Sequence, residues 1–184
     1  DIVDKLKKQL EWWRHYTAIN EGSLDNNPSP GNKRGGLTTI LEKSLGAVAK
    51  GGNSILQDVL MYAEPLRNKG FNFMDSPGYD PVSVTGQVAS GANVICFTTG
   101  RGSCFGCKPV PSLKLSTNTA MYEKMEEDMD INCGTIAEGK EDIEKVGNRI
   151  FDLVVNTASG NKSKSEINGY GDEEFNPWQV GVVM

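Results

Sequence analysis

The segment ANVICFTT, residues 92–99, is a nearly continuous apolar run that is followed at once by the glycine-rich turn GRG. A short run of this kind is typical of a strand that is buried on both faces, as in a parallel sheet. Shorter strand patterns occur at 71–75 (FNFMD), 112–117 (SLKLST) and 130–136 (DINCGTI). A buried strand of this type predicts a sheet with helices on both faces.

Helical patterns separate these predicted strands. Residues 80–90 begin with Asp80 as a cap and Pro81 in the first turn, which is a favoured start of a helix. Further helices are predicted over 117–129 and over 141–159. The apolar face of the last one consists of Ile143, Val146, Ile150, Phe151 and Val154. Strands that alternate with helices predict an α/β fold with a mostly parallel sheet, a Rossmann-like variant.

The first part of the chain is predicted to be helical, with one long polar interruption. Apolar residues at steps of three to four predict a helix over residues 2–20, and Thr38 or Thr39 caps a second one that ends at the Gly51–Gly52 pair. Residues 54–66 predict a third, short helix that Pro65 ends. The segment NNPSPGNKRGG, residues 26–36, contains no large apolar side chain and is predicted to be a structured loop.

Composition limits the function more than the fold. A chain of 184 residues with a net charge of −5, and with both signs interleaved, fits one domain and offers no basic face to nucleic acid. No apolar run reaches the roughly 20 residues of a membrane span, and the charged start does not resemble a signal peptide. The four cysteines are read as reduced thiols of a cytoplasmic protein. Because the chain has no initiating Met, we expect it to lack the N-terminal part of its domain, with further strands of the sheet.

The turns after the predicted strands give the candidate site, because ligands of open α/β sheets bind beyond the carboxyl ends of the strands. These turns are rich in hydroxyl and amide side chains and in glycine, which suits a ligand dense in hydroxyl and carboxylate groups. We expect them to form one rim together with the segment 26–36. The predicted substrate-binding residues are Asn27, Ser29, Gly31, Asn32, Thr98, Thr99, Gly100, Gly102, Thr117 and Asn118.

Two basic side chains, Arg101 and Lys33, are the predicted catalytic residues. Arg101 lies between two glycines just past the buried strand and can hold a carboxylate with two hydrogen bonds; alternatively it pairs with a structural Asp or Glu. Lys33 is the predicted general base, provided that burial lowers its pKa; the alternative is an exposed loop lysine.

Asp130 and Asn132 are the predicted ligands of a divalent cation, with Asp75 as a third; the alternative is that Asp130 only caps or pairs locally. Cys104 and Cys107 have CxxC spacing, but no second pair completes a zinc site, and a redox role is disfavoured by the prolines that follow.

Long stretches of the chain resemble one known family. NNPSPGNKRGGLTTILEKSLGAVAKGG, FMDSPGYDPVSVTGQVASGANVICFTTGRGSCFGCKPVPSLKLSTNT and DMDINCGTIAEG are similar to the C-terminal region of the altronate dehydratase/galactarate dehydratase (altronate hydrolase) family. On this resemblance, residues 1–184 form the second half of the C-terminal α/β catalytic domain. The upstream motifs of the family, including a cysteine-bearing glycine-rich stretch, are absent.

The resemblance implies a hydro-lyase that removes water from a sugar acid such as altronate or galactarate to give a 2-keto-3-deoxy acid. It further implies a requirement for Fe²⁺, other divalent cations being an alternative, and a small N-terminal β domain and a connecting region as partners in a longer chain, itself expected to be a homo-oligomer. An iron–sulfur cluster is left open. Two alternatives stay open as well: a sulfolactate sulfo-lyase, to which the chain is also similar, and a sugar-acid-binding or assembly domain without catalysis.

Overall fold

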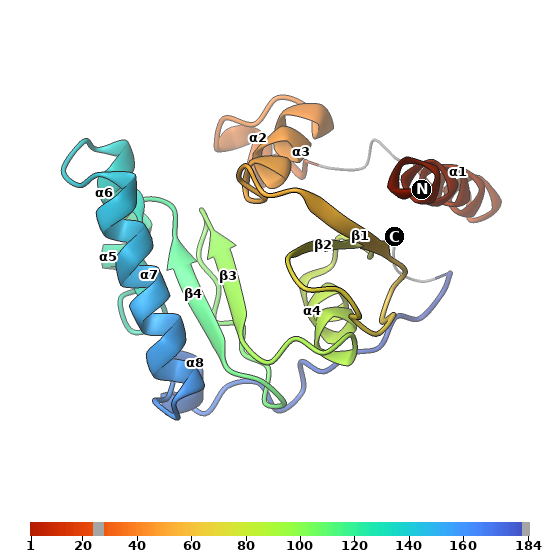
Figure 1. Cartoon of the computed structure of the whole chain (residues 1–184). Helices are drawn as coiled ribbons and strands as arrows, with labels where there is room; N and C mark the ends of the chain where they lie inside the picture. The colour runs from red at the N-terminus through yellow and green to blue at the C-terminus, as the bar shows by residue number, and fades with distance from the viewer. Residues whose placement is uncertain (24–27, 182–184) are drawn as a thin grey trace. The chain divides into compact units, whose positions relative to one another are not determined.

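The computed structural model describes residues 1–23 and 28–181, which form two compact units. Unit 1 consists of Asp1–Tyr79 with Gln179–Met184, and unit 2 consists of Asp80–Trp178. Each unit has its own parallel sheet, two-stranded in unit 1 and three-stranded in unit 2. The predicted α/β class is therefore confirmed, but its strands fall into two sheets where one was expected (Figure 1).

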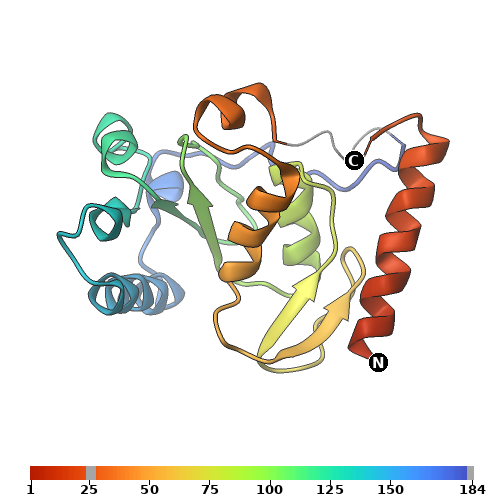
Figure 2. The same ribbon diagram turned by 90° about the horizontal axis from the view of Figure 1, so that it is seen from above.

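Unit 1 begins with the predicted long helix α1, Ile2–Ile19, which Asp1 and Asp4 close with a capping box. Two strands follow later in the chain, β1 (Leu56–Leu60) and β2 (Phe71–Met74), and they pair in parallel. Figure 2 shows α1 running beside these strands. Its contacts include a 2.7 Å hydrogen bond from Trp13 Nε1 to Asp75 Oδ2.

Two sequence predictions for unit 1 need correction. Residues 54–66 do not form a helix: the middle of this segment is β1, whose Val59 and Leu60 are buried. A short apolar run fits either structure by periodicity, and pairing with β2 decides for the strand. The segment 26–36 is not only a loop, because Pro30–Arg34 form the short helix α2, with Ser29 as its N-cap. The predicted helix α3, Ile40–Ala49, is confirmed, with Thr39 as its cap.

Unit 2 follows its predicted order with two corrections. The predicted strand 130–136 is a strand only at Ile131–Asn132, because residues 134–137 turn into a short helix, and a further short helix lies at residues 164–167 where none was predicted. The helix α4 (Asp80–Ala89) precedes β3 (Ile95–Thr99) and β4 (Ser112–Ser116). After β4 come α5 (Thr119–Lys124), β5 (Ile131–Asn132), α6 (Gly134–Ala137), α7 (Ile143–Ala158) and α8 (Lys164–Ile167). The three strands are parallel in the order β3-β4-β5. In Figure 1, α4 and α7 lie on opposite sides of this sheet.

Polar and apolar residues alternate along β4, so the two types lie on opposite faces of the sheet. Its register with β3 pairs Ile95 with Ser112 and Phe97 with Lys114, so these side chains share one face. On that face Val84, Ile95, Phe105, Cys107 and Val110 form an apolar cluster. Lys114 is fully buried there, and its Nζ donates to the carbonyl oxygen of Phe105 at 3.1 Å. Burial lowers the pKa of this lysine.

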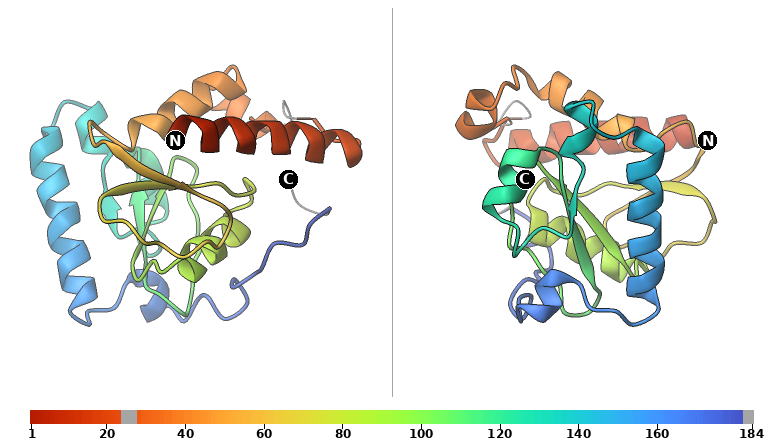
Figure 3. Two further views of the ribbon diagram at one scale, coloured as in Figure 1. Left: turned by 45° about the vertical axis from the view of Figure 1, so that its right-hand side comes forward. Right: turned by 90° about the vertical axis from the view of Figure 1, so that its left-hand side faces the viewer.

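The helix α7 runs along the sheet of unit 2 (Figures 1 and 3) but uses only part of its apolar surface. Val146 and Thr157 are its buried residues. Ile143 and Phe151 of the predicted apolar face are 75% and 67% exposed. The helix was therefore predicted correctly, but much of its apolar face has no cover within the described residues.

Candidate functional site

Three turns meet at the carboxyl edge of the sheet in unit 2. They are residues 98–102 at the end of β3 and beyond it, 117–119 after β4, and 132–134 at the end of β5 and beyond it. Because the three strands are parallel and adjacent, their carboxyl ends lie at the same edge. The structure thus brings together the predicted residues of unit 2, namely Thr98, Thr99, Gly100, Arg101, Gly102, Thr117, Asn118 and Asn132.

Hydrogen bonds tie the first two turns together. The backbone N–H of Thr117 donates to the carbonyl oxygen of Thr99 at 3.0 Å, and Asn118 Nδ2 donates to that of Gly100 at 2.8 Å. The hydroxyl oxygen of Thr99 accepts from the backbone N–H groups of Arg101 and Gly102. Thr99 and Asn118 therefore shape the turns. The hydroxyl of the exposed Thr117 also donates to the carbonyl oxygen of Thr99, at 3.3 Å, so only its oxygen is open as an acceptor for a ligand.

Gly134 allows the third turn to approach the second. Its backbone N–H donates to Asn132 Oδ1 at 2.9 Å, and the Asn132 amide also contacts the hydroxyl of Thr119. A Cβ atom at position 134 would lie 2.2 Å from the backbone nitrogen of Thr119. The close contact of two backbones explains why glycine is needed here.

Arg101 lies exposed on this edge. Among the described residues its guanidinium has no acidic partner, so the alternative of a structural ion pair is not observed there. An exposed guanidinium without a counter-ion, next to a ring of small polar groups, is suited to bind a carboxylate.

The sequence analysis missed Arg149 of α7. Its Nη2 donates to the carbonyl oxygen of Asn132 at 3.0 Å, and the guanidinium forms two 3.1 Å hydrogen bonds with Glu141. With Thr135 and Lys145, Arg149 lowers the pKa of Glu141 to about 2. The spacing of Glu141, Lys145 and Arg149 at steps of four was a usable signal for the ion pairs, but the bond to β5 was not visible in the sequence.

The predicted cation ligands are engaged in other contacts. Asp130 Oδ2 accepts from the backbone N–H of Lys114 at 2.7 Å, and Oδ1 accepts from that of Lys164 at 2.9 Å. Asp75 belongs to unit 1, where burial raises the pKa of its carboxyl group. Within residues 1–23 and 28–181, no three His, Cys, Asp or Glu side chains gather as a metal site requires. The residues described here do not fit a complete metal centre, and the assignment of Asp130 and Asn132 stays a prediction.

The remaining predicted residues lie in unit 1. Asn27 falls outside the described residues. Ser29 Oγ accepts from the side-chain amide of Asn32 at 2.6 Å, and Gly31 is in the first turn of α2. Lys33 is exposed, so the described residues do not supply the burial on which its role as a base depends. A rim shared by α2 and the turns of unit 2 stays a prediction, because the two groups belong to different units.

Comparison with known proteins places this architecture in a family. A family model described as "D-galactarate/Altronate dehydratase, C-terminal" matches residues 1–183. The chain belongs to this family. The resemblance noted from the sequence is thereby confirmed.

Curated members and relatives of the D-galactarate/altronate dehydratase family align along most of the chain. Galactarate dehydratase (L-threo-forming) of Escherichia coli is 41% identical over 88% of the chain and 31% of its own length. Altronate dehydratase of Bacillus subtilis is 35% identical over 100% of the chain and 36% of its own length. The beta subunit of (2R)-sulfolactate sulfo-lyase of Chromohalobacter salexigens is 33% identical over 92% of the chain and 42% of its own length.

The chain therefore spans only 31–42% of the length of these relatives. The family membership applies to this C-terminal region, and the activity of the whole protein is a matter of proposal. Within the described residues, no helix combines the length and the apolar character that crossing a membrane requires.

Proposed function

We propose that this chain is part of a sugar-acid dehydratase, a hydro-lyase that acts on altronate, galactarate or a close analogue. The observation that carries the proposal is the exposed Arg101 at the carboxyl edge of β3-β4-β5, without an acidic partner among the described residues. Family membership supports it, since relatives named galactarate and altronate dehydratase are 34–41% identical to the chain. The assignment of residues 1–184 to the second half of the C-terminal catalytic domain is part of the proposal.

In the proposed reaction, a base removes the proton on the carbon next to the carboxylate, and the hydroxyl on the following carbon leaves as water. The C–H electron pair becomes the second bond of a C=C, while the C–O electron pair leaves with the hydroxyl group, which takes up a proton to become water. The resulting enol converts to a 2-keto-3-deoxy acid. Arg101 binds the carboxylate and stabilises the negative charge that develops on it. The hydroxyl oxygen of Thr117 accepts a hydrogen bond from a substrate hydroxyl group, and Lys33 is the proposed base.

Iron enters this proposal through the family resemblance alone. When bound, Fe²⁺ would supply Lewis-acid assistance to the departure of the hydroxyl group. Because the described residues do not assemble a metal centre, most of its ligands would come from elsewhere in a longer protein.

The proposal also includes the setting of the protein. We place it in the reducing cytoplasm, which agrees with its four free cysteines, Cys96, Cys104, Cys107 and Cys133. The proposed partners are the sugar acid, the other domains of a longer chain and further copies in a homo-oligomer. The uncovered apolar side of α7 agrees with the last two.

The test is the dehydration of altronate and galactarate by the full-length protein, reconstituted with Fe²⁺ under reducing conditions. We expect Arg101→Ala to reduce kcat/KM by the equivalent of about 2–5 kcal/mol, because a substrate carboxylate loses its ion pair. Arg101→Lys should keep only part of the activity, since an ammonium group cannot form the two parallel hydrogen bonds. Arg67→Ala, at an exposed arginine of unit 1, is the control. An unchanged kcat/KM in Arg101→Ala would exclude Arg101 from the site.

One alternative activity has an observation in its favour. The sulfo-lyase relative is similar over 92% of the chain, so elimination of sulfite from (2R)-sulfolactate is the second candidate. Turnover of sulfolactate without turnover of either sugar acid would replace the first proposal with this one. Binding of sugar acids without any turnover would instead support a non-catalytic binding or assembly domain.

A further inference from the structure

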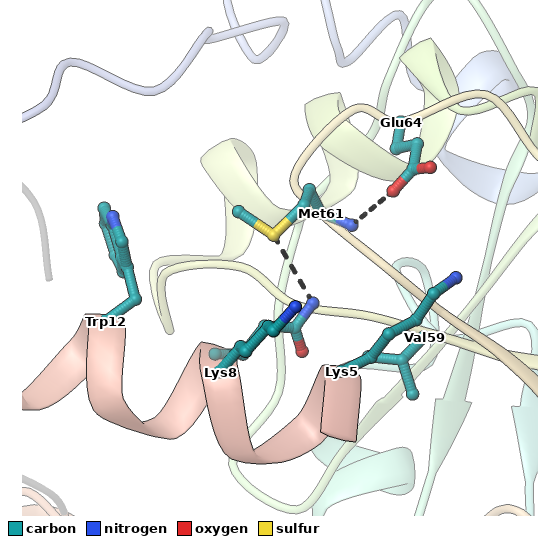
Figure 4. A pocket seen from close by; sticks show the side chains of 7 residues that line it. Lys5, Lys8, Trp12, Val59, Met61 and Glu64 are labelled. Atoms are coloured by element: carbon teal, nitrogen blue, oxygen red, sulfur yellow. Dashed lines mark hydrogen bonds between the residues drawn. The ribbon is translucent and has the colours of Figure 1, made fainter. Parts of the chain in front are cut away.

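A pocket of about 260 Å³ lies in unit 1, where α1 passes the carboxyl end of β1. Figure 4 shows it with its lining side chains. One wall comes from α1, where Lys5, Lys8, Gln9 and Trp12 follow the helical spacing of a single face. The other wall comes from the end of β1 and the turn after it, with Val59, Met61 and Glu64.

Gln9 contributes an unsatisfied acceptor to this wall. Its side chain is only 7% exposed, and its Nε2 donates to the carbonyl oxygen of Leu60 at 3.1 Å. The other amide atom, Oε1, is buried and has no hydrogen-bond donor among the described residues. An unsatisfied buried acceptor costs on the order of 1–3 kcal/mol. The side chain of Gln9, which lines the pocket, therefore lacks a donor for its Oε1.

Three charged side chains, Lys5, Lys8 and Glu64, line the pocket. Lys5 is paired with Asp58, and Glu64 Oε2 accepts from the backbone N–H of Met61 at 2.9 Å. Lys8 is exposed and has no acidic partner in the described part of the chain. The lining between these charges is apolar, with Val59, Met61 and the ring of Trp12. The pocket thus combines an apolar lining with one cation that has no acidic partner among the described residues.

A pocket with this mainly apolar lining does not suit a sugar acid. A polyhydroxy ligand would lose the hydration of its hydroxyl groups against Val59, Met61 and Trp12 without gaining matching hydrogen bonds. The volume is also below the roughly 300 Å³ at which small-molecule sites begin. A large apolar side chain fits the interior, a backbone N–H beside it can donate to Gln9, and a neighbouring carboxylate can pair with Lys8.

We propose that this pocket is a docking site for a polypeptide segment from the part of the longer family protein that lies outside residues 1–184. The segment would insert one large apolar side chain next to an acidic residue. The relatives supply such an occupant, because 58–69% of their length lies outside the aligned region. The proposal rests on the proposed function only in requiring that longer protein, and it does not depend on the reaction.

The test is site-specific photo-crosslinking in the full-length protein. The photo-reactive residue p-benzoylphenylalanine replaces Lys8 in one variant and Lys7 in the control, since both lysines are exposed on α1 and point in different directions. After irradiation, mass spectrometry identifies the linked peptide. We expect position 8, and not position 7, to link within the same polypeptide to a segment outside residues 1–184 that contains a large apolar and an acidic residue.

The other outcomes contradict the proposal. A link from position 8 only to residues 1–184, a link to a second copy, or a yield no higher than at position 7 would each overturn it. Dehydratase activity is measured on the same samples. A specific link in a protein without activity keeps the docking site and removes the proposed reaction, whereas activity without the link does the reverse.

Discussion

A Cβ atom built on Gly134 would lie 2.2 Å from the backbone nitrogen of Thr119 and 2.5 Å from the carbonyl carbon of Asn118. Neither backbone atom can move aside as the end of a flexible side chain can. We therefore expect Gly134→Ala to reduce the free energy of unfolding by about 3 kcal/mol, the upper end of the usual cost of overpacking. Urea unfolding of the parent and the variant checks this value. A variant as stable as the parent would show that the turns after β4 and β5 do not pack as described.

Glu141 is the residue whose protonation most clearly affects unit 2. Its hydrogen bonds with Arg149, Thr135 and Lys145 lower its pKa from 4.5 to about 2. The folded protein therefore binds this proton less tightly than the unfolded chain, so the contribution of Glu141 to stability is complete above pH 4.5 and is lost as the pH falls towards 2. We expect the urea midpoint of the parent to fall more steeply between pH 5 and pH 3 than that of Glu141→Gln. Glu144→Gln, at an exposed carboxylate in the first turn of α7, should follow the parent; parallel curves for all three proteins would contradict the prediction.

At the scale of elements, the stability of α7 depends both on its helix propensity and on what covers its surface. Its glycine, Gly147, lies inside the helix with no neighbouring atom within 4 Å of a Cβ position. We expect Gly147→Ala to raise the free energy of unfolding by about 1 kcal/mol, because alanine has the higher helix propensity and meets no obstacle. Glycine-to-alanine substitution should thus lower the free energy of unfolding at position 134 and raise it at position 147. A loss of stability at position 147, measured in the full-length protein, would indicate that another surface covers this turn of α7.

The segments that were predicted wrongly in unit 1 are both short. Residues 54–66 have a short apolar run that fits a helix or a strand, and only the parallel pairing of β1 with β2 decides between them. In the segment 26–36, Ser29 and Pro30 are favourable helix-start residues, but the run after them is so short and glycine-rich that a loop was the natural prediction. Long periodic segments such as α1 and α7, by contrast, were recognised because many residues repeat the same signal.

At the scale of the whole molecule, the uncovered side of α7 calls for a partner surface. Ile143, Phe151 and Val155 are exposed at spacings of eight and four residues, which places them along one side of the helix. We expect Phe151→Asp to weaken the assembly of the full-length protein, because a charge cannot be buried there without a partner. Light scattering after size-exclusion chromatography, with hydrogen exchange of α7, measures the effect. Asn156→Asp adds the same charge on another side of α7 and should leave the assembly intact; equal behaviour of the two variants would mean that the exposed side faces solvent.

Much of the candidate site was predicted from the sequence because strand ends can be located from composition. Thr98 to Gly102, Thr117 and Asn118 were assigned to the turns after β3 and β4, and parallel pairing brings them to one edge. Their individual contacts were not predictable. Asn118 proved to cap α5 and bind Gly100, and Asp130 proved to accept two backbone N–H groups. Such contacts depend on angles and distances between segments that are far apart in the chain.

The sequence by itself determined the α/β class, the family, most helices and the residue types at the strand ends, because each of these depends on local periodicity or on long identical strings. Only the tertiary structure decided that the strands form two sheets, that Arg149 holds the end of β5, that Lys114 is buried, and that Gln9 lines a pocket with an unsatisfied acceptor. The physical reason is that burial and hydrogen bonding are properties of pairs of segments. A sequence pattern specifies which face of an element is apolar, but the partner that covers that face is set by packing over the whole chain.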